Sequence, residues 1–503
     1  MHFSRYIRFW AQRRGDAIAI SCAGQRLTWR EIDRDSAVLA GWLASQGVHR
    51  GDRLGCLLGN SLAWCVAFFA SLRMGAIFVP LNPLFGRFEL EQIALDAGCA
   101  AVLSTPSLVE RIGIVDRTQP TDRPRLYLRN GAQACDYTDA LATSLPFEER
   151  DLSDDDVMMI CYTSGTTGVP KGATFTHRAV DAAMQGLILN FGLRGAEERF
   201  LILAPLAFTG GVISNLAPMI VVGASTFLEP TVDPARAFKL LTEEHITYFG
   251  GVPALWERIA MAPGFTEARF DELRSAYTGG APVPRPLLEK FLAKGVTIRQ
   301  QYGCTEACGG VSSPDAAEVA RNPVSCGHAL PGVEIELRDE HGQTTPRGEV
   351  GEICLRGPQL MSGYWNNEAA TQDAFDGDWY RSGDLGRYDE HGGLIIVDRK
   401  KNMLISGGVN IYPAEVERAL ASIPGIIECV VFGLPSTRWG QEVAAMVYAP
   451  DLNDADLIRE QARQLLGAVK APKHLRLSPQ PLPKTPSNKI ARTRLPELFA
   501  SLS

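Results

Sequence analysis

The residues with the clearest chemical potential lie in one short stretch, residues 162–172. Its glycines free the backbone to curl, so that backbone N–H groups and hydroxyls can converge on the oxygens of an anion, and Lys171 adds positive charge. The spacing is not the GxxxxGK[ST] of kinases and GTPases. A plain Ser/Thr/Gly linker is the alternative, but linkers rarely begin directly after a buried strand. The stretch therefore predicts a phosphate-binding loop made of Thr163, Ser164, Gly165, Thr166, Thr167, Gly168 and Lys171.

The cysteines, histidines and charges exclude several other kinds of chemistry. The 11 cysteines form no CxxC pair, and the 8 histidines include no HExxH motif. This pattern indicates free thiols in a reducing compartment rather than disulfides or zinc, and it predicts a cytoplasmic protein. Lys and Arg number 50 against 57 Asp and Glu, so the net charge of −7 leaves no basic excess for binding nucleic acid.

A larger framework must hold the loop, and helical patterns alternate with short apolar strands along most of the chain. Helices are expected at residues 29–46 and 62–74, and Ser61 is placed to cap the second. Such alternation predicts stacked α/β units with parallel sheets. The expected strands are residues 53–58, 100–103, 157–162, 200–203, 248–250 and 297–300.

The pattern changes in the last third of the chain. Residues 332–356 alternate with a period of two and carry a turn signal at His341-Gly342, which predicts a small antiparallel sheet or barrel. A charged turn at residues 398–402 then precedes a compact α+β segment. We therefore expect an α/β protein with two domains, residues 1–400 and residues 401–503.

Two regions with apolar residues could be a secretory signal or a transmembrane segment. The N-terminus has no apolar core or cleavage site of a secretory signal, and Phe3, Ile7 and Trp10 predict a first helix docked on its own domain. Residues 200–228 contain no charge and are long enough to span a bilayer, but prolines and glycines interrupt them. We expect a buried strand, a pocket-lining loop, a short helix and a strand there, and no transmembrane segment.

Several distant segments, in order along nearly the whole chain, resemble the adenylate-forming (AMP-binding) superfamily, in particular its acyl-CoA synthetase branch. The resemblance implies a large N-terminal domain of stacked α/β sheets plus a small β-barrel, followed by a small mobile α+β domain. It is carried, besides the loop, by residues 279–282, 301–306, 382–384, 398–399, 406–411 and 483–490.

The resemblance implies an ATP site. The family's segment beside the adenine ring is matched here by Gly279, Gly280, Ala281 and Pro282. The resemblance also implies nucleotide-binding roles for Gln301, Tyr302, Gly303 and Thr305. Asp384 would accept hydrogen bonds from the ribose hydroxyls, with Arg399 nearby, although a turn-capping aspartate is the alternative. Glu306 would hold Mg²⁺ on the ATP phosphates rather than be a surface carboxylate. Tyr302 would stack on adenine or belong to the core.

The resemblance also implies the catalytic residues, Lys489, Glu306, Thr163 and Lys171. Lys489 would hold the substrate carboxylate and the α-phosphate together, since a point charge suits the negative charge that develops there. The family has glycine before this lysine, whereas this chain has Asn488. Asparagine tolerates the left-handed conformation, so we expect the turn to persist.

The implied reaction has two steps, and in the family the C-terminal domain rotates between them. A carboxylic acid and Mg·ATP give an acyl-adenylate and pyrophosphate, and a thiol, usually of CoA, then displaces AMP. The hinge would be Lys401. Gly407 and Gly408 would line the CoA tunnel, since glycine lets backbone approach a thin chain closely.

The acyl pocket would contain Phe208, Thr209, Gly210, Gly211, Gly303, Cys304 and Cys308. Phe208 would gate the ATP side, pack on the acyl group or simply be core. The two cysteines are packing residues or inhibitor-sensitive thiols. Small residues here favour an aryl, alicyclic or medium-chain fatty monocarboxylic acid.

Several readings of the activity stay open at this point. An acid–CoA ligase fits best, acting on a small acid, ATP and CoA as a monomer or homodimer. A stand-alone enzyme that loads a carrier protein, a luciferase-like oxygenase and an inactive nucleotide-binding scaffold are the alternatives.

Overall fold

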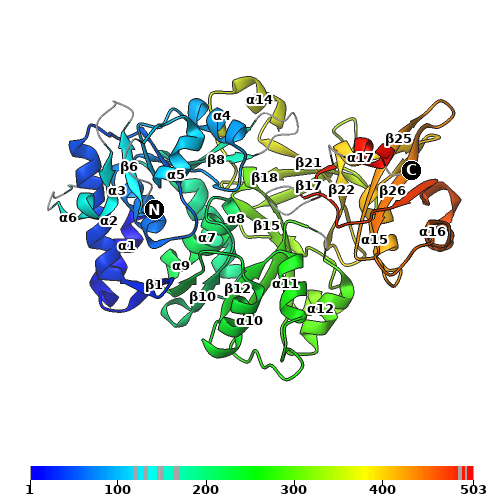
Figure 1. Cartoon of the computed structure of the whole chain (residues 1–503), viewed down its shortest axis with the longest axis horizontal. Coiled ribbons are helices and arrows are strands. Elements are labelled where there is room, and N and C mark those ends of the chain that lie inside the picture. The colour runs from blue at the N-terminus through cyan, green and yellow to red at the C-terminus, as the bar shows by residue number, and fades with distance from the viewer. Residues whose placement is uncertain are drawn as a thin grey trace. The chain divides into compact units, whose positions relative to one another are not determined.

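The computed structural model describes residues 2–116, 123–128, 134–143, 147, 152–163, 170–281, 283–484, 490–492 and 495–501 (Figure 1). The chain forms two compact units. The first consists of Met1–Ile335 and Leu355–Tyr380, and the second of Glu336–Cys354 and Arg381–Ser503. A domain boundary at residue 400 stays a prediction.

A nine-stranded sheet in the first unit has the order β16-β15-β14-β13-β12-β10-β11-β1-β2. Neighbours from β14 to β1 are parallel, as the alternation predicts, whereas β2, β15 and β16 pair antiparallel. The strands are β1 (Ile18–Cys22), β2 (Gln25–Thr28), β10 (Arg199–Ile202), β11 (Ser225–Leu228), β12 (Tyr248–Gly251), β13 (Ser275–Gly279), β14 (Ile298–Cys304), β15 (Gly309–Ser313) and β16 (His328–Ala329).

A second, eight-stranded sheet of the same unit has the order β19-β9-β8-β4-β3-β5-β6-β7. Its centre, from β8 to β5, is parallel, and its outer strands are antiparallel. The strands are β3 (Arg53–Leu57), β4 (Ile77–Pro80), β5 (Ala101–Ser104), β6 (Arg125–Leu128), β7 (Cys135–Asp136), β8 (Val157–Thr163), β9 (Lys171–Thr176) and β19 (Gly363–Tyr364).

Some helices of the first unit begin at a capping side chain that the sequence indicates. Ser61 caps α3 by accepting a hydrogen bond from the Trp64 N–H at 3.3 Å, as predicted. The helices are α1 (Ser4–Arg14), α2 (Trp29–Ser45), α3 (Leu62–Met74), α4 (Arg87–Ala97), α5 (Pro106–Val109), α6 (Tyr137–Ala142), α7 (His177–Phe191), α8 (Thr209–Gly211), α9 (Ala217–Val222), α10 (Pro234–Glu243), α11 (Pro253–Ala260), α12 (Arg285–Leu292), α13 (Ala316–Arg321) and α14 (Glu368–Ala374).

The two apolar regions are part of the folded first unit. Phe3, which directly precedes the first helix, and Ile7 within it are fully buried, as predicted for a docked helix. Residues 200–228 form β10, α8, a π-helical turn at Val212–Leu216, α9 and β11. Among the described residues, no helix combines the length and the apolar character needed to cross a bilayer.

An aromatic cluster anchors α10, α11 and α12, which lie side by side in Figure 1. Trp256 of α11 is fully buried and packs edge-on against Phe249 and Phe291, with ring centroids 4.8 and 4.9 Å away. Its indole N–H donates to the Tyr277 carbonyl at 3.1 Å. One side chain therefore ties a surface helix to β12 and β13, the strands that lead toward the predicted nucleotide site.

The second unit contains two smaller sheets. Residues around the predicted period-two segment form a five-stranded sheet with β17 (Glu334–Arg338), β18 (Gly351–Arg356), β20 (Phe375–Asp376), β21 (Trp379–Tyr388) and β22 (Leu394–Arg399). Of these strands, β22 and most of β17, β18 and β21 belong to the second unit, whereas β20 belongs to the first. Asp398 and Arg399 end β22 instead of lying in the predicted charged turn, because they pair with Leu385 and Asp384. The turn itself is the 3-10 helix Lys400–Asn402.

The C-terminal segment is α+β, as predicted. Its sheet has the order β24-β23-β26-β25 with β27 on β26, and apolar side chains of α15 and α16 pack on it. The elements are β23 (Leu404–Ser406), β24 (Val409–Ile411), β25 (Glu428–Ser436), β26 (Gly440–Tyr448), β27 (His474–Leu477), α15 (Pro413–Ala421), α16 (Ala455–Lys470) and α17 (Leu495–Ser501).

Replacing Trp256 with alanine removes a fully buried ring and its hydrogen bond. We expect Trp256→Ala to lower the free energy of unfolding by about 3 to 5 kcal/mol, measured by urea denaturation. Trp439→Ala, whose ring is 38% exposed, serves as a control that should cost much less. Equal losses for both variants would contradict the anchoring role of Trp256.

Candidate active site

The predicted adenine-side residues lie at the carboxyl ends of two adjacent parallel strands. Gly279, the last residue of β13, pairs with Gln301 of β14. Gly280 and Ala281 follow β13, while Tyr302 and Gly303 continue β14. Ligands bind at this end of strands in open α/β sheets. Gln301 and Tyr302 are both 7% exposed, so Tyr302 is largely core. Pro282 lies outside the described residues.

Glycine is required at position 303 for a steric reason. β14 turns back into β15 through the 3-10 helix at Thr305–Ala307. A Cβ on Gly303 would lie 1.8 Å from the Gly309 carbonyl oxygen, which is closer than any side chain can approach. Cys308 in this turn has a φ of +55°, a conformation that few non-glycine residues adopt. The turn is tight, and it carries Thr305 and Glu306.

The Glu306 carboxylate has a specific partner that sequence reasoning missed. The Tyr364 hydroxyl donates to Glu306 Oε1 at 3.0 Å. Burial and the negative charge of Glu306 raise the pKa of Tyr364, so its hydroxyl stays protonated at neutral pH. Tyr364 is 58 residues from Glu306 and lies in no motif, so only the fold reveals the pair.

The two ends of the predicted phosphate loop lie next to each other. Thr163 ends β8, Lys171 begins β9, and the two residues pair in the antiparallel ladder. The Tyr162 hydroxyl donates to Asp96 Oδ2 at 2.5 Å, which holds this end of β8 on α4. Lys171 Nζ lies 5.2 Å from the centroid of the Tyr364 ring. Ser164, Gly165, Thr166, Thr167 and Gly168 lie outside the described residues.

The predicted acyl segment meets the Glu306 turn. Thr209 Oγ1 lies 3.4 Å from Thr305 Oγ1. A Cβ added to Gly210 would have no atom within 4 Å, so there is open space beside it, whereas Gly211 packs tightly on Pro205. Phe208 packs edge-on against Phe85 at 6.0 Å between centroids.

Hydrogen bonds from the π-helical turn fix the backbone of the predicted acyl segment. The Asn215 side-chain amide donates to the Gly210 carbonyl at 2.6 Å and to the Tyr277 hydroxyl at 2.9 Å. The Tyr248 hydroxyl donates to the Ser214 carbonyl at 2.9 Å. Cys308 is fully buried and burial raises the pKa of its thiol, which favours packing over reactivity, while Cys304 is partly exposed.

In the second unit, Asp384 and Arg399 form an ion pair. Arg399 Nε lies 3.1 Å from Asp384 Oδ1, and the two residues face each other across β21 and β22. Asp384 is 6% exposed. Its backbone N–H donates to Ser382 Oγ at 3.1 Å. The carboxylate is therefore fixed by a cation and is more than a turn cap.

The predicted hinge follows a firmly held aspartate. Asp398 accepts hydrogen bonds from the Arg399 N–H at 2.6 Å, from Asn402 Nδ2 at 3.0 Å and from the Ala414 N–H at 2.7 Å. Lys401 lies in the turn that these bonds enclose. Burial, with the nearby charge of Arg399, lowers the pKa of Lys401.

Gly407 and Gly408 form the turn between β23 and β24, and both have positive φ angles, +59° and +80°. The Gly407 N–H donates to the Trp439 carbonyl at 2.9 Å, and a Cβ on Gly407 would lie 2.7 Å from the Trp439 ring. Lys484 and Ile490 pair as an antiparallel bridge. Lys489, the predicted catalytic lysine, lies outside the described residues.

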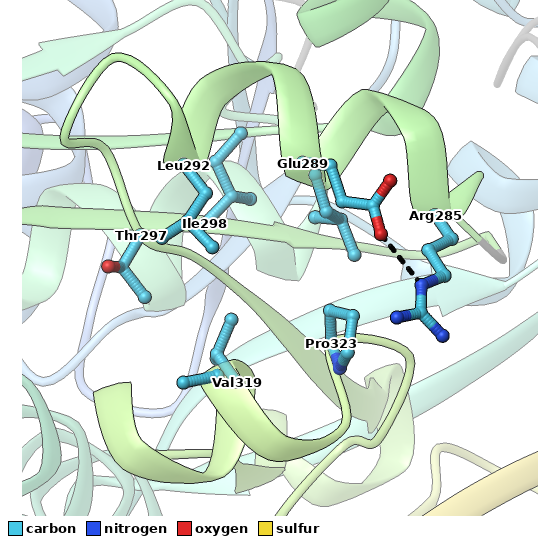
Figure 2. A pocket seen from close by; sticks show the side chains of 9 residues that line it. Arg285, Glu289, Leu292, Thr297, Ile298, Val319 and Pro323 are labelled. Carbon is cyan, nitrogen blue, oxygen red and sulfur yellow. Dashed lines mark hydrogen bonds and ion pairs between the residues drawn. The ribbon is translucent and has the colours of Figure 1, made fainter.

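A separate shallow cavity of about 70 Å³ in the first unit contains none of the predicted site residues (Figure 2). Leu292, Ile298 and Val319 line it, and an ion pair of 2.8 Å joins Arg285 to Glu289 at one side. Its lining comes from α12, α13 and the start of β14.

The residues present fit a magnesium ion that arrives with ATP. Within the described ranges, no group of three or more His, Cys, Asp or Glu side chains could hold a metal. Mg²⁺ bound to ATP needs only one or two carboxylates, because phosphate oxygens and water supply its other ligands. Glu306, with one carboxylate oxygen held by Tyr364, is suited to be such a ligand.

Comparison with protein families decides which family the chain belongs to. Residues 7–365 match the model of the AMP-binding enzymes, and residues 415–489 match that of the AMP-binding enzyme C-terminal domain. The chain belongs to the AMP-binding enzyme family. These matches confirm the resemblance that the motifs indicated.

The relatives are acid–CoA ligases over nearly the full length. A feruloyl-CoA synthase of an Amycolatopsis species is 35% identical over 496 residues, which cover 97% of this chain and 98% of the relative. A long-chain-fatty-acid–CoA ligase of Mycobacterium tuberculosis is 32% identical over 480 residues, which cover 95% of this chain and 94% of the relative.

A solved structure shows the same fold. The o-succinylbenzoate CoA synthetase of Bacillus subtilis, in complex with its acyl-adenylate intermediate, has a TM-score of 0.86 and is 28% identical, covering 97% of each chain. The same protein has been solved with ATP and magnesium ion. The enzyme is thus an AMP-forming acid–CoA ligase of mixed α/β fold that uses ATP, Mg²⁺ and CoA.

Replacing Gly303 with alanine tests whether the tight turn requires glycine. Gly303→Ala must displace the turn that carries Glu306, so we expect at least a tenfold loss of acid-dependent pyrophosphate release and a destabilisation of about 1 to 3 kcal/mol. Gly59→Ala is the matched control, because a Cβ there meets no atom within 4 Å. If Gly303→Ala retained the activity of the control, the steric requirement would be disproved.

Proposed function

We propose that the acid is an aromatic monocarboxylic acid and that the enzyme converts it to its CoA thioester. The observation that carries this proposal is the uncharged, partly aromatic surroundings of the predicted acyl segment, in which Phe208 packs edge-on against Phe85 and the exposed Gly210 would have no atom within 4 Å of an added Cβ. The side chains around this segment, including Phe85, Thr305, Asn215 and Tyr277, carry no charge. A second carboxylate or an α-amino group on the acid would have no partner among them.

The relatives support the same class without fixing the acid. The Amycolatopsis relative is named for a feruloyl thioester, and a structural neighbour with a TM-score of 0.88 and 25% identity is an anthranilate CoA ligase in complex with anthranoyl-AMP. Both acids are aromatic. The mycobacterial relative is named for long-chain fatty acids, so acids of that class belong in the test.

In the first step, we propose that a carboxylate oxygen of the acid attacks the α-phosphorus of ATP. A new P–O bond forms, the bond to the β-phosphate oxygen breaks, and pyrophosphate leaves. Lys489 would hold the carboxylate beside the α-phosphate, while Lys171 and the loop hydroxyls would bind the phosphate oxygens. Asp384 would bind the ribose. Mg²⁺ held by Glu306 would neutralise phosphate charge when bound.

In the second step, the thiol sulfur of CoA attacks the acyl carbon and AMP leaves, so that a thioester bond replaces the mixed anhydride. The thiol proton passes to solvent or to AMP. We propose that rotation about Lys401 brings Gly407 and Gly408 to the CoA chain for this step. A cytoplasmic location and a monomeric or homodimeric state remain predictions.

The acid class and the acceptor are tested together. Purified enzyme with Mg·ATP is given aryl, alicyclic and fatty acids, with and without CoA, and pyrophosphate and thioester are measured. We expect the highest kcat/KM for aryl acids, with a CoA-dependent thioester.

Each other outcome of this assay contradicts the proposal. A preference for fatty acids would reject the aromatic class. Pyrophosphate without thioester would indicate a carrier-protein acceptor, light emission or oxygen uptake would indicate an oxygenase, and no pyrophosphate with any acid would indicate an inactive scaffold.

The role of Lys489 is tested by separating the two steps. We expect Lys489→Ala to slow pyrophosphate release about 10²- to 10³-fold, while a preformed acyl-adenylate is still converted to thioester with CoA. Lys484→Ala is the control, because Lys484 Nζ is paired with Glu428 at 2.7 Å. Equal loss of both steps in Lys489→Ala would contradict a role confined to adenylation.

A further inference from the structure

Two groups that would face ATP phosphates contact one tyrosine. The Tyr364 hydroxyl donates to Glu306 Oε1 at 3.0 Å, and Lys171 Nζ lies 5.2 Å from the centroid of its ring. The first contact is a hydrogen bond to a carboxylate, and the second is a cation over an aromatic face. A single side chain therefore touches both the proposed magnesium ligand and the cation of the phosphate loop.

Tyr364 is itself held at both ends. Its backbone pairs with Ala173 of β9, and its N–H donates to Thr371 Oγ1 at 2.8 Å. At the other end its hydroxyl donates to Glu306 Oε1. A side chain fixed in this way can hold a carboxylate in one orientation.

The backbone around Glu306 is tied to the same segment. The Met361 N–H donates to the Glu306 carbonyl at 2.8 Å, and the Trp365 N–H donates to the Gly172 carbonyl at 2.7 Å. Residues 361–365 therefore bridge the turn that carries Glu306 and the strand that begins with Lys171. The hydroxyl bond engages Oε1, so the other carboxylate oxygen can bind a cation.

We propose that Tyr364 is a positioning residue for magnesium-bound ATP, its hydroxyl orienting Glu306 and its ring orienting Lys171. This inference rests on the proposed role of Glu306 as the magnesium ligand. When a residue that is hydrogen-bonded to a metal ligand is removed, the metal affinity typically falls about 10- to 100-fold. A purely architectural role for the hydroxyl would instead change stability alone.

The variant Tyr364→Phe separates these roles, because it keeps the ring over Lys171 and removes only the hydroxyl. We expect the Mg²⁺ concentration for half-maximal pyrophosphate release to rise about 10- to 100-fold, with the rate largely restored at saturating Mg²⁺. Without acid, calorimetric titration of ATP should show that Mg²⁺ tightens ATP binding less in the variant than in the wild type.

Tyr6→Phe is the matched control. Tyr6 is also a half-buried tyrosine of the first unit whose hydroxyl donates to a carboxylate, Asp181 Oδ1, at 2.9 Å, and it contacts none of the proposed site residues in the described hydrogen bonds. We expect its magnesium dependence to equal that of the wild type. Thermal unfolding of both variants reports any shared loss of stability.

The variant Glu306→Gln distinguishes the failure of this inference from the failure of the proposed function. If Glu306→Gln leaves the magnesium dependence unchanged, Glu306 is not the magnesium ligand and the proposed site is wrong. If Glu306→Gln shifts it but Tyr364→Phe behaves like Tyr6→Phe, the positioning role is overturned. A Tyr364→Phe enzyme that loses activity equally at all Mg²⁺ concentrations also overturns it.

Discussion

The close approach of Gly303 to the Gly309 carbonyl is the constraint on which the rest of the candidate site depends. It lets β14, a strand of the parallel sheet, reverse at once into β15. The reversal places Thr305 beside Thr209 and Glu306 beside Tyr364, so the predicted acyl segment meets the same short turn that carries the proposed magnesium ligand. A side chain at position 303 would separate the two, because backbone atoms occupy its place.

Much of the framework could be predicted because it follows from local patterns. The predicted helix at residues 62–74 coincides with α3, and the predicted strand at 157–162 falls one residue short of β8. The strand at 297–300 was predicted too short, since Gly303 and Cys304 lack the apolar character that marks a strand. They belong to β14 because their partners in β15 are supplied by the fold.

Only the site residues that lie within the sequence motifs could be predicted. Glu306, Asp384 and Lys171 were predicted by the resemblance, and the structure gives each a defined partner. Tyr364 escaped prediction, because its contact with Glu306 arises from the pairing of β19 with β9 and not from any spacing along the chain. Trp439, which packs on Gly407, escaped for the same reason. The roles of these residues in the reaction remain the proposals made above.

The antiparallel pairing of Thr163 with Lys171 has a consequence for how such a site can change in evolution. In nucleotide-binding folds whose phosphate loop opens directly into a helix, anion binding draws on the helix dipole, so the loop and the packed helix are constrained together. Here β9 intervenes, and α7 begins only at His177. If the loop binds phosphate as proposed, its affinity would come from Lys171 and from the hydroxyls and backbone N–H groups of the loop rather than from the dipole of α7, so substitutions in the loop could change phosphate affinity without altering the sheet.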